Sequence, residues 1–340
     1  MNKNISKLLQ YAIIKLSLIP VMIWIISSLV FILLRVAPGD PVDAILGSGA
    51  DQEARDLLRD KLGLNDSLIM QYWKYIIKLI HFNLGDSLST QEPVSQIVVK
   101  ALPASLELGL FAIIIAILIG LPIGYVGLKY KGTKYDYISR IIGIGSYAIP
   151  PFWGAMLIQL IFSIYLRIFP IGGRFPIFYE QPHHTGFLIL DSLINNNFSA
   201  LQGAFYHLFL PATTLGFLIS GIFSRSFRLN LDKALESDYV EAAKCRGISE
   251  QKIMINHALP NSLLPILTIT GVTIASLAGG ALLIEVTFSW PGIALKLQEA
   301  IFQRDYNLVQ GIVIITSFLI VSINLIIDIL IAIFDPRIEF

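Results

Sequence analysis

The sequence contains few charged residues for its length. Of its 340 residues, 14% are Asp, Glu, Lys or Arg, whereas ordinary soluble domains carry about 25%. It has one cysteine, Cys245, which excludes an intrachain disulfide and a cysteine-based metal site. The dipeptide Gly-Lys occurs nowhere, so there is no Walker A phosphate-binding loop. There is also no run of Lys and Arg that would indicate nucleic-acid binding.

Long apolar runs dominate the sequence instead. Apolar residues make up 55% of it, and the mean hydropathy is +0.69. A helix that crosses a bilayer needs about 20 mostly apolar residues, because the hydrocarbon core is about 30 Å thick. Six segments meet this requirement and predict an all-α membrane protein with six transmembrane helices: residues 16–34, 106–128, 138–166, 209–227, 263–286 and 309–334.

The spans divide the chain into three parts. Residues 1–37 hold an N-terminal tail and the first span, whose apolar stretch is too long for a cleaved signal peptide. Residues 38–104 predict an external insert with two helices, at 51–62 and 67–82, the first of them ended by Gly63. Residues 105–340 form a core of five spans. Within this core we expect a short helix near 187–193 in an external loop, and a break of the third span at Pro150 and Pro151.

The distribution of Lys and Arg predicts the orientation. Basic residues are concentrated in the loop between spans two and three and in the segment between spans four and five, and they are few in the loops after spans three and five. By the positive-inside rule, the basic loops and both termini lie in the cytoplasm. We therefore expect a multi-pass protein of the cell inner (cytoplasmic) membrane, with the lipid bilayer as a partner.

The predicted cytoplasmic loop at 229–260 is too polar to span a membrane. Asp238 and Glu241 predict a capped helix start, Gly247 a left-handed stop, and Ser249 the start of a second helix. Pro260 precedes the fifth span. Two small residues flanked by charges make a low ridge on the first of these helices, which suits insertion into a groove of another protein.

This loop resembles the EAA loop of bacterial ABC-importer permeases. The match consists of Glu241-Ala242-Ala243, Gly247 six residues after the glutamate, and Leu-Pro at 259–260, with His257 where that loop prefers isoleucine. Further segments are similar to the B-type subunit of the dipeptide/oligopeptide/nickel permease family. They are residues 37–41 (APGDP), 85–88 (GDSL), 102–107 (LPASLE), 288–292 (FSWPG), 304–306 (RDY), 309–311 (VQG) and 335–337 (DPR).

The resemblance implies a type I importer permease that carries out no chemistry itself. Its coupling loop would dock a separate ATPase through Glu241, Ala242, Ala243, Arg246, Gly247, His257 and Pro260. A second, C-type permease, two ATPase subunits and an external substrate-binding protein would complete the importer. The chain would bind no cofactor, because the partner ATPase subunits would use ATP and Mg. Peptides are the expected cargo, and nickel, glutathione or another small solute is the alternative.

Polar and small residues inside the spans are candidates for the translocation path. Asn324 and Asp328 share one face of the sixth span, where they indicate either a substrate or proton path or, as we favour, hydrogen bonds between helices. Gly271, Ala275 and Gly279 form a small-residue stripe, which fits an interface, a path or close packing within the subunit.

Other classes of protein and site receive little support. Two adjacent histidines, His183 and His184, are a weak metal signal, since neighbours on a helix point about 100° apart, and we expect no metal site. A membrane-embedded enzyme would need several acidic or histidine side chains inside the spans. A secondary transporter would need buried carboxylates and no docking loop.

Overall fold

The computed structural model describes residues 2–36, 41–47, 49–176 and 184–334. Every named element in these residues is a helix, which confirms the all-α prediction. The long helices are α1 (Asn2–Val36), α5 (Val94–Lys129), α6 (Lys134–Ala148), α9 (Phe198–Leu235), α12 (Leu259–Thr287) and α14 (Tyr306–Phe334). The shorter helices are α2 (Pro41–Leu46), α3 (Gln52–Leu62), α4 (Leu68–Ile80), α7 (Pro151–Gln159), α8 (Leu188–Ile194), α10 (Asp238–Cys245), α11 (Glu250–Ile253) and α13 (Ile293–Phe302), together with two wide π-helical segments, η1 (Leu160–Tyr165) and η2 (Met254–Ala258).

Four helices are long and apolar enough to cross a membrane without a break. They are α1 over Ile13–Val36, α5, α9, and α14 over Tyr306–Ile331, and they contain the predicted spans one, two, four and six. Helices α5 and α9 are longer than predicted: α5 begins inside the expected insert, and α9 runs on to Leu235. The first part of the predicted loop 229–260 is therefore a continuation of the fourth span.

The third span is broken at Pro150 and Pro151, as the sequence predicts. It consists of α6 and of α7 with η1, which are bent by 102° at the break. Pro151 cannot donate a backbone hydrogen bond, and it disfavours helical geometry at the residue before it. The backbone at Ile149 and Pro150 is accordingly extended, with ψ of 124° and 128°. Helix α12 covers the predicted fifth span, while the count of six spans stays a prediction.

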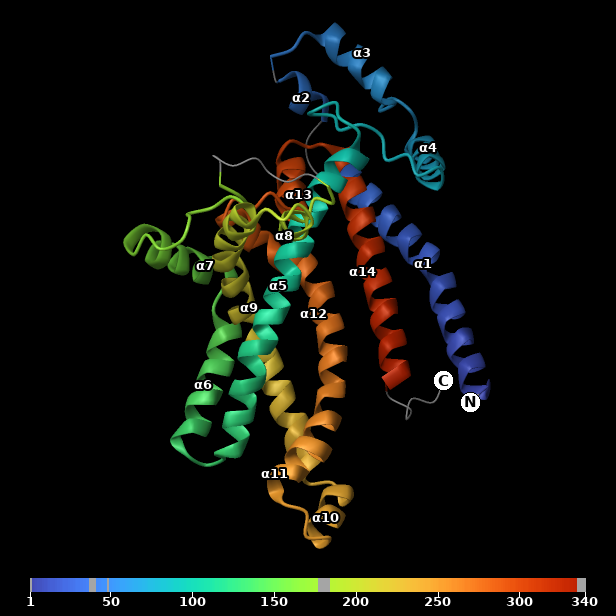
Figure 1. The fold of residues 1–340 in the computed structure, drawn as a ribbon. Coiled ribbons are helices and arrows are strands. Elements are labelled where there is room, and N and C mark those ends of the chain that lie inside the picture. Colours follow the sequence, from blue (N-terminus) through green and yellow to red (C-terminus); the bar gives the residue numbers. More distant parts are fainter. Residues whose placement is uncertain (1, 37–40, 48, 177–183, 335–340) are drawn as a thin grey trace.

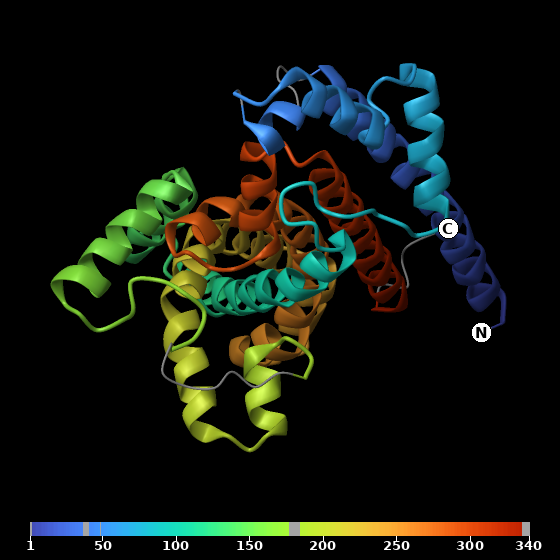
Figure 2. The same ribbon diagram turned by 90° about the horizontal axis from the view of Figure 1, so that it is seen from above.

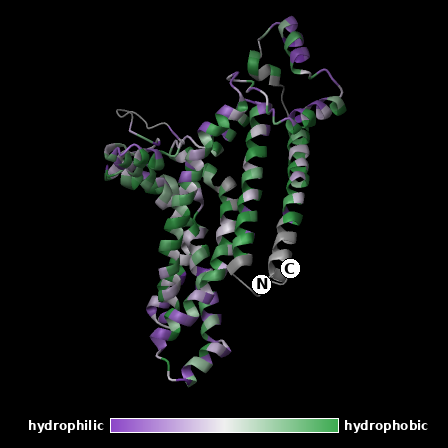
Figure 3. Cartoon of the chain, turned by 45° about the vertical axis from the view of Figure 1, so that its right-hand side comes forward, coloured by the Kyte–Doolittle hydropathy of each residue, from purple (hydrophilic) through white to green (hydrophobic). Residues whose placement is uncertain are grey.

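The helices are arranged so that polar structure lies at the two ends of an apolar bundle. In Figure 1, α5, α6, α9 and α12 form the bundle, and α14 and α1 lie beside it as a pair. Helices α2–α4, α8 and α13 lie at one end, which we call the insert end, and α10 and α11 lie at the other, which we call the elbow end. Figure 2 shows the bundle from above, and Figure 3 shows that its long helices are mostly hydrophobic while purple segments gather toward the ends. The start of α1 and the end of α14 point toward the elbow end.

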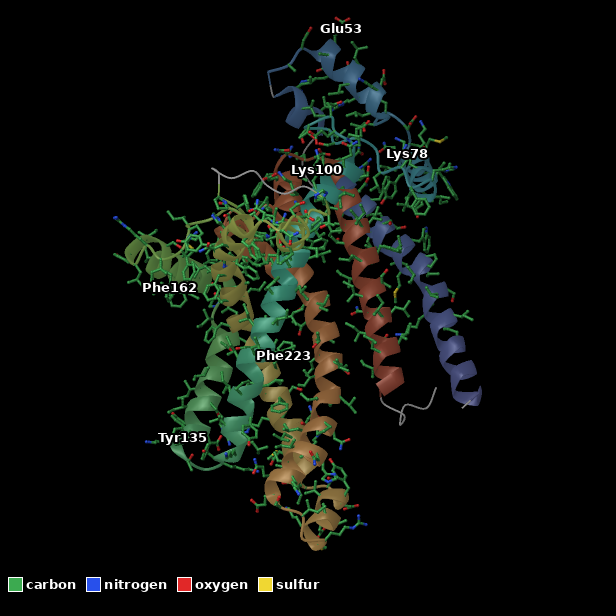
Figure 4. The ribbon with its side chains drawn as sticks, in the orientation of Figure 1. Glu53, Lys78, Lys100, Tyr135, Phe162 and Phe223 are labelled. Atoms are coloured by element: carbon green, nitrogen blue, oxygen red, sulfur yellow. The ribbon has the colours of Figure 1, made fainter. Side chains whose placement is uncertain are left out.

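Small residues bring α5 and α9 into close contact. A Cβ added at Gly120 of α5 would lie 2.6 Å from the carbonyl oxygen of Ser220, and one added at Gly124 would lie 2.6 Å from that of Ser224. Phe223, labelled in Figure 4, is fully buried beside this contact. Close approach of backbones at glycines is how helices associate in a membrane, so these glycines determine the spacing of the bundle core.

The insert has the two helices that the sequence predicts. Asp51 caps α3 by accepting a hydrogen bond from the amide of Gln52, and Gly63 ends it with φ of 68°. Ser67 caps α4 by accepting from the amide of Met70. Helix α4 then packs on α1, where the ring of Tyr75 stacks on Phe31.

Candidate functional site

The elbow consists of α10, α11, η2 and the turn at Gly247. Helix α10 begins at Asp238, and the residue at its cap position is Ser237, whose backbone is extended. The prediction that Asp238 is the cap is therefore wrong by one residue. The side chain of Ser237 does not cap α10 but donates to the carbonyl of Ala234 at 2.5 Å, inside the preceding helix. Gly247 has φ of 73°, which is the left-handed stop that the sequence predicts.

The elbow has an inner and an outer face. Val240, Ala243 and Ile253 are buried together, with Ile248 packed against them. The outer face consists of the residues that are exposed to solvent: Glu241, Ala242, Lys244, Cys245, Arg246 and Gly247. Nothing lies within 4 Å of a Cβ added at Gly247. Only one alanine of the predicted small-residue ridge, Ala242, is therefore free to contact another protein.

The elbow is joined to the spans through η2. Ala258 is fully buried, in one cluster with Phe227 and Leu231 of α9 and Ile266 of α12. His257 lies in η2 and is half-buried, and Pro260 is exposed at the start of α12. A displacement of the elbow would act on α9 and α12 together, since both are packed against this one segment.

Acidic residues that we did not select from the sequence hold the insert end together. Glu285 of α12 is fully buried; it accepts a hydrogen bond from the hydroxyl of Ser105 and, at 2.9 Å, one from the amide of Leu295 in α13. Ser105 in turn accepts from the amide of Ile293 at 2.8 Å. The indole of Trp290 donates to the carbonyl of Ala104 at 2.9 Å. These contacts join the family segments LPASLE and FSWPG.

Glu107 is a second buried acidic residue at the insert end, and it lies in α5 two positions after Ser105. Its carboxylate accepts from the guanidinium of Arg174 at 2.7 Å and from the amide of Ile189 in α8 at 2.9 Å. Both side chains of this ion pair are almost wholly buried. Glu107 and Glu285 thus each bind the first turn of a short helix, where a negative charge is favourable.

Asp305 makes a third link, between the segments GDSL and RDY. It is fully buried and accepts from the hydroxyl of Ser87 at 2.6 Å, the amide of Ser89 at 3.1 Å and the amide of Leu308 at 3.0 Å. A sequence signal for this contact exists only in hindsight. Asp305 lies between Arg304 and Tyr306, which is an ordinary sequence for a loop. Only the fold brings Ser87 and Ser89 close to it.

Two family models together match almost the whole length of the chain. Residues 112–340 match the family described as the binding-protein-dependent transport system inner membrane component, and residues 8–109 match its N-terminal membrane component. The chain belongs to this family. It is a multi-pass inner-membrane permease subunit of an ABC importer, which confirms the resemblance seen in the sequence.

Relatives of the permease cover almost its whole length. A di/tripeptide transport system permease protein DppB of Pseudomonas aeruginosa (strain UCBPP-PA14) is 35% identical over 315 residues, 92% of this chain and 94% of the relative. A dipeptide transport system permease protein of Alkalihalophilus pseudofirmus is 35% identical over 339 residues, 98% and 100% of the two chains. An oligopeptide transport system permease protein of Bacillus subtilis (strain 168) is 33% identical over 323 residues, 95% and 96%.

The structure brings three of the candidate path residues of the permease together: Gly271, Asn324 and Asp328 line one cavity between α1, α12 and α14. Asp328 of α14 accepts a hydrogen bond from the ammonium group of Lys15 in α1 at 2.9 Å, which is a contact between helices. A Cβ at Gly271 would lie 3.1 Å from Ile327 and 3.7 Å from the amide oxygen of Asn324, so at this position α12 packs on α14 of the same chain. The surroundings of Ala275 and Gly279 lie outside the described side chains.

The histidine pair of the permease is only partly described. His183 lies outside the described residues, as do residues 37–40 and 335–337 of the family segments. The ring of His184 is 2.9 Å from the amide oxygen of Asn195. Among the residues that the structure describes, no three His, Cys, Asp or Glu side chains gather as a metal site would require.

The amide of His184 belongs to a loop that is held by a carboxylate. Asp191 of α8 accepts from the hydroxyl and amide of Thr185 and from the amides of His184 and Gly186. Burial raises the pKa of Asp191, but these hydrogen bonds outweigh it and leave the pKa below its usual value.

Proposed function

We propose that this permease imports peptides, with its elbow as the contact for a separate ATPase subunit that drives the movement of the spans. The observation that carries the proposal is the exposed outer face of the elbow, which bears Glu241 and Ala242 of α10 and, just after the helix, Arg246 and Gly247. The names of the relatives support peptides as the cargo, since they are dipeptide, di/tripeptide and oligopeptide permeases.

The coupling follows from how the elbow is built. Its inner cluster keeps α10 and α11 in one unit, and η2 packs that unit on α9 and α12. A groove of the ATPase that closes when ATP binds would therefore tilt two spans at once. ATP and Mg are used by the ATPase, and this chain binds neither.

The complete importer would hold two permeases, two ATPase subunits and an external binding protein. Because the ATPase is cytoplasmic, the elbow end and both termini of this chain lie in the cytoplasm, and the insert end faces outward. The binding protein would deliver its cargo at the insert end, where α8, α13 and the insert are joined by Glu107, Glu285 and Asp305. A C-type permease would close the translocation path from the other side.

Cysteine crosslinking tests the docking face. In a Cys245→Ser background, Ala242→Cys and Ala243→Cys differ by one position, but Ala242 is exposed whereas Ala243 is 5% exposed. In the assembled transporter, position 242 should crosslink to the ATPase and position 243 should not. The proposal fails if position 242 gives no crosslink in a complex that hydrolyses ATP, or if both positions react equally.

Uptake measurements test the cargo. A strain that lacks this permease should lose uptake of labelled dipeptides or oligopeptides and regain it with the wild-type gene. Loss of nickel or glutathione uptake in place of peptide uptake would contradict the peptide assignment without affecting the docking face. Transport by the purified chain alone would contradict both, because it would indicate a channel or secondary carrier.

A further inference from the structure

Helix α4 has an apolar face that the rest of the described chain leaves uncovered. Its side chains are disposed as three stripes at helical spacing. Tyr72, Tyr75 and Ile76 face α1: the hydroxyl of Tyr72 is 2.7 Å from that of Ser28, and the ring of Tyr75 stacks on Phe31. The second stripe is apolar and exposed by 52–72%: Ile69, Trp73, Ile77 and Ile80. The third stripe is polar and consists of Lys74, Lys78 and His81.

The contacts with α1 place α4 within the apolar part of the span. Ser28 lies eight residues before Val36, the end of the span, which at 1.5 Å per residue is about 12 Å along the helix. The start of α4 adds to this contact, because Leu68, Ile69 and Tyr72 line one groove with Trp24, Leu29 and Ile32 of α1. On the α1 side, the groove is therefore bounded by exposed side chains of a membrane span.

Helix α4 also runs across α1 rather than along it. Figure 1 shows α4 nearly end-on while α1 lies in the plane of the view, and Figure 2, turned by 90°, shows α4 along its length. If α1 crosses the membrane, α4 is close to parallel with the membrane plane. An amphipathic helix in this orientation, with aromatic and aliphatic residues on one face and lysines on another, is the form of an interfacial helix.

We propose that α4 is embedded in the membrane leaflet at the insert end, with Ile69, Trp73, Ile77 and Ile80 in contact with acyl chains. The exposed stripe is continuous with the lipid-facing residues of α1 through their shared groove, so one apolar surface covers both helices. Lys74 and Lys78 lie toward the headgroups, where Lys74 also binds Asp66 at 2.6 Å. The insert is therefore held to the bilayer directly. Because α4 packs on α1, it also limits how far the outer part of α1 can move out of the bilayer.

Spin labels on single cysteines test this placement. Each label is introduced in a Cys245→Ser background, into the complete transporter in nanodiscs of phosphatidylethanolamine and phosphatidylglycerol. Collision rates are measured with oxygen, which concentrates in hydrocarbon, and with a water-soluble nickel chelate. Val21→Cys on α1, outside the groove shared with α4, is the lipid reference, and Glu53→Cys on α3 is the water reference; both native side chains are exposed.

Labels at 69, 73, 77 and 80 should match the label at 21, with oxygen collisions exceeding nickel collisions, and labels at 74 and 78 should shift toward the water reference. These side chains are at the surface, so the substitutions leave the core packing unchanged. High nickel accessibility along the stripe would show that α4 lies in water and would overturn the proposal. Low accessibility to both reagents would show that a protein covers the stripe, which would overturn it equally.

Discussion

Replacing Gly120 with alanine tests how α5 and α9 pack. The new Cβ would lie 2.6 Å from the backbone oxygen of Ser220 and 2.9 Å from the Cβ of Phe223, whereas ordinary contacts begin at 3.4 Å. A backbone carbonyl cannot rotate aside as a flexible side chain can. The two helices must therefore separate, and overpacking of this kind costs about 1–3 kcal/mol. We expect a lower melting temperature of the solubilised permease.

The matched control is Gly145→Ala in α6, where nothing lies within 4 Å of the added Cβ. Both variants gain the same helix propensity, about 1 kcal/mol for Ala over Gly, so the difference between their melting temperatures isolates the steric effect. Melting is followed by intrinsic fluorescence in the same detergent for both proteins. Equal melting temperatures for the two variants would refute the close contact between α5 and α9.

Three further predictions follow from the polar contacts. Asp328→Asn removes the ion pair with Lys15, so it should weaken the packing of α1 on α14 and leave substrate preference unchanged; a double-mutant cycle with Lys15→Gln measures the coupling, and a change of substrate preference without a change of assembly would contradict the structural role. Asp305→Asn leaves buried donors unpaired at a cost of about 1–3 kcal/mol, so proteolysis within residues 84–93 should accelerate, and unchanged cleavage would contradict the link. The lowered pKa of Asp191 stabilises its loop above the unfolded value of about 4, and this stabilisation is lost as pH falls through the lower folded pKa. The protection factor for amide exchange at Gly186, which is the intrinsic rate divided by the observed rate, should therefore fall in acid in the wild type and be independent of this transition in Asp191→Asn.

Local sequence features determined a large part of this protein. Apolar length identified α1, α5, α9 and α14 as spans, since the bilayer fixes how many residues a span needs. Gly63 and Gly247 fixed the ends of two helices, because glycine adopts the left-handed backbone conformation that ends a helix without steric cost. The family segments identified the class of the protein, and the positions of the elbow residues followed from them.

The tertiary structure decided which of these residues are accessible. The sequence treats Ala242 and Ala243 as one ridge, but the burial of Val240 and Ile253 places only Ala243 on the inner face. The sequence also predicted that Pro150 and Pro151 break the third span, but only the tertiary structure gives the bend of 102° between its two parts.

Contacts between distant residues could not be read from the sequence at all. Glu285 and Ser105 are 180 positions apart, and Ser87 and Asp305 are 218 apart, so no local spacing predicts that they meet. The same holds for Lys15 and Asp328, at the two ends of the chain. The sequence by itself determined the length, polarity and ends of the helices, which depend on neighbours along the chain, while only the tertiary structure decided which buried charges are satisfied, because their partners come from other helices.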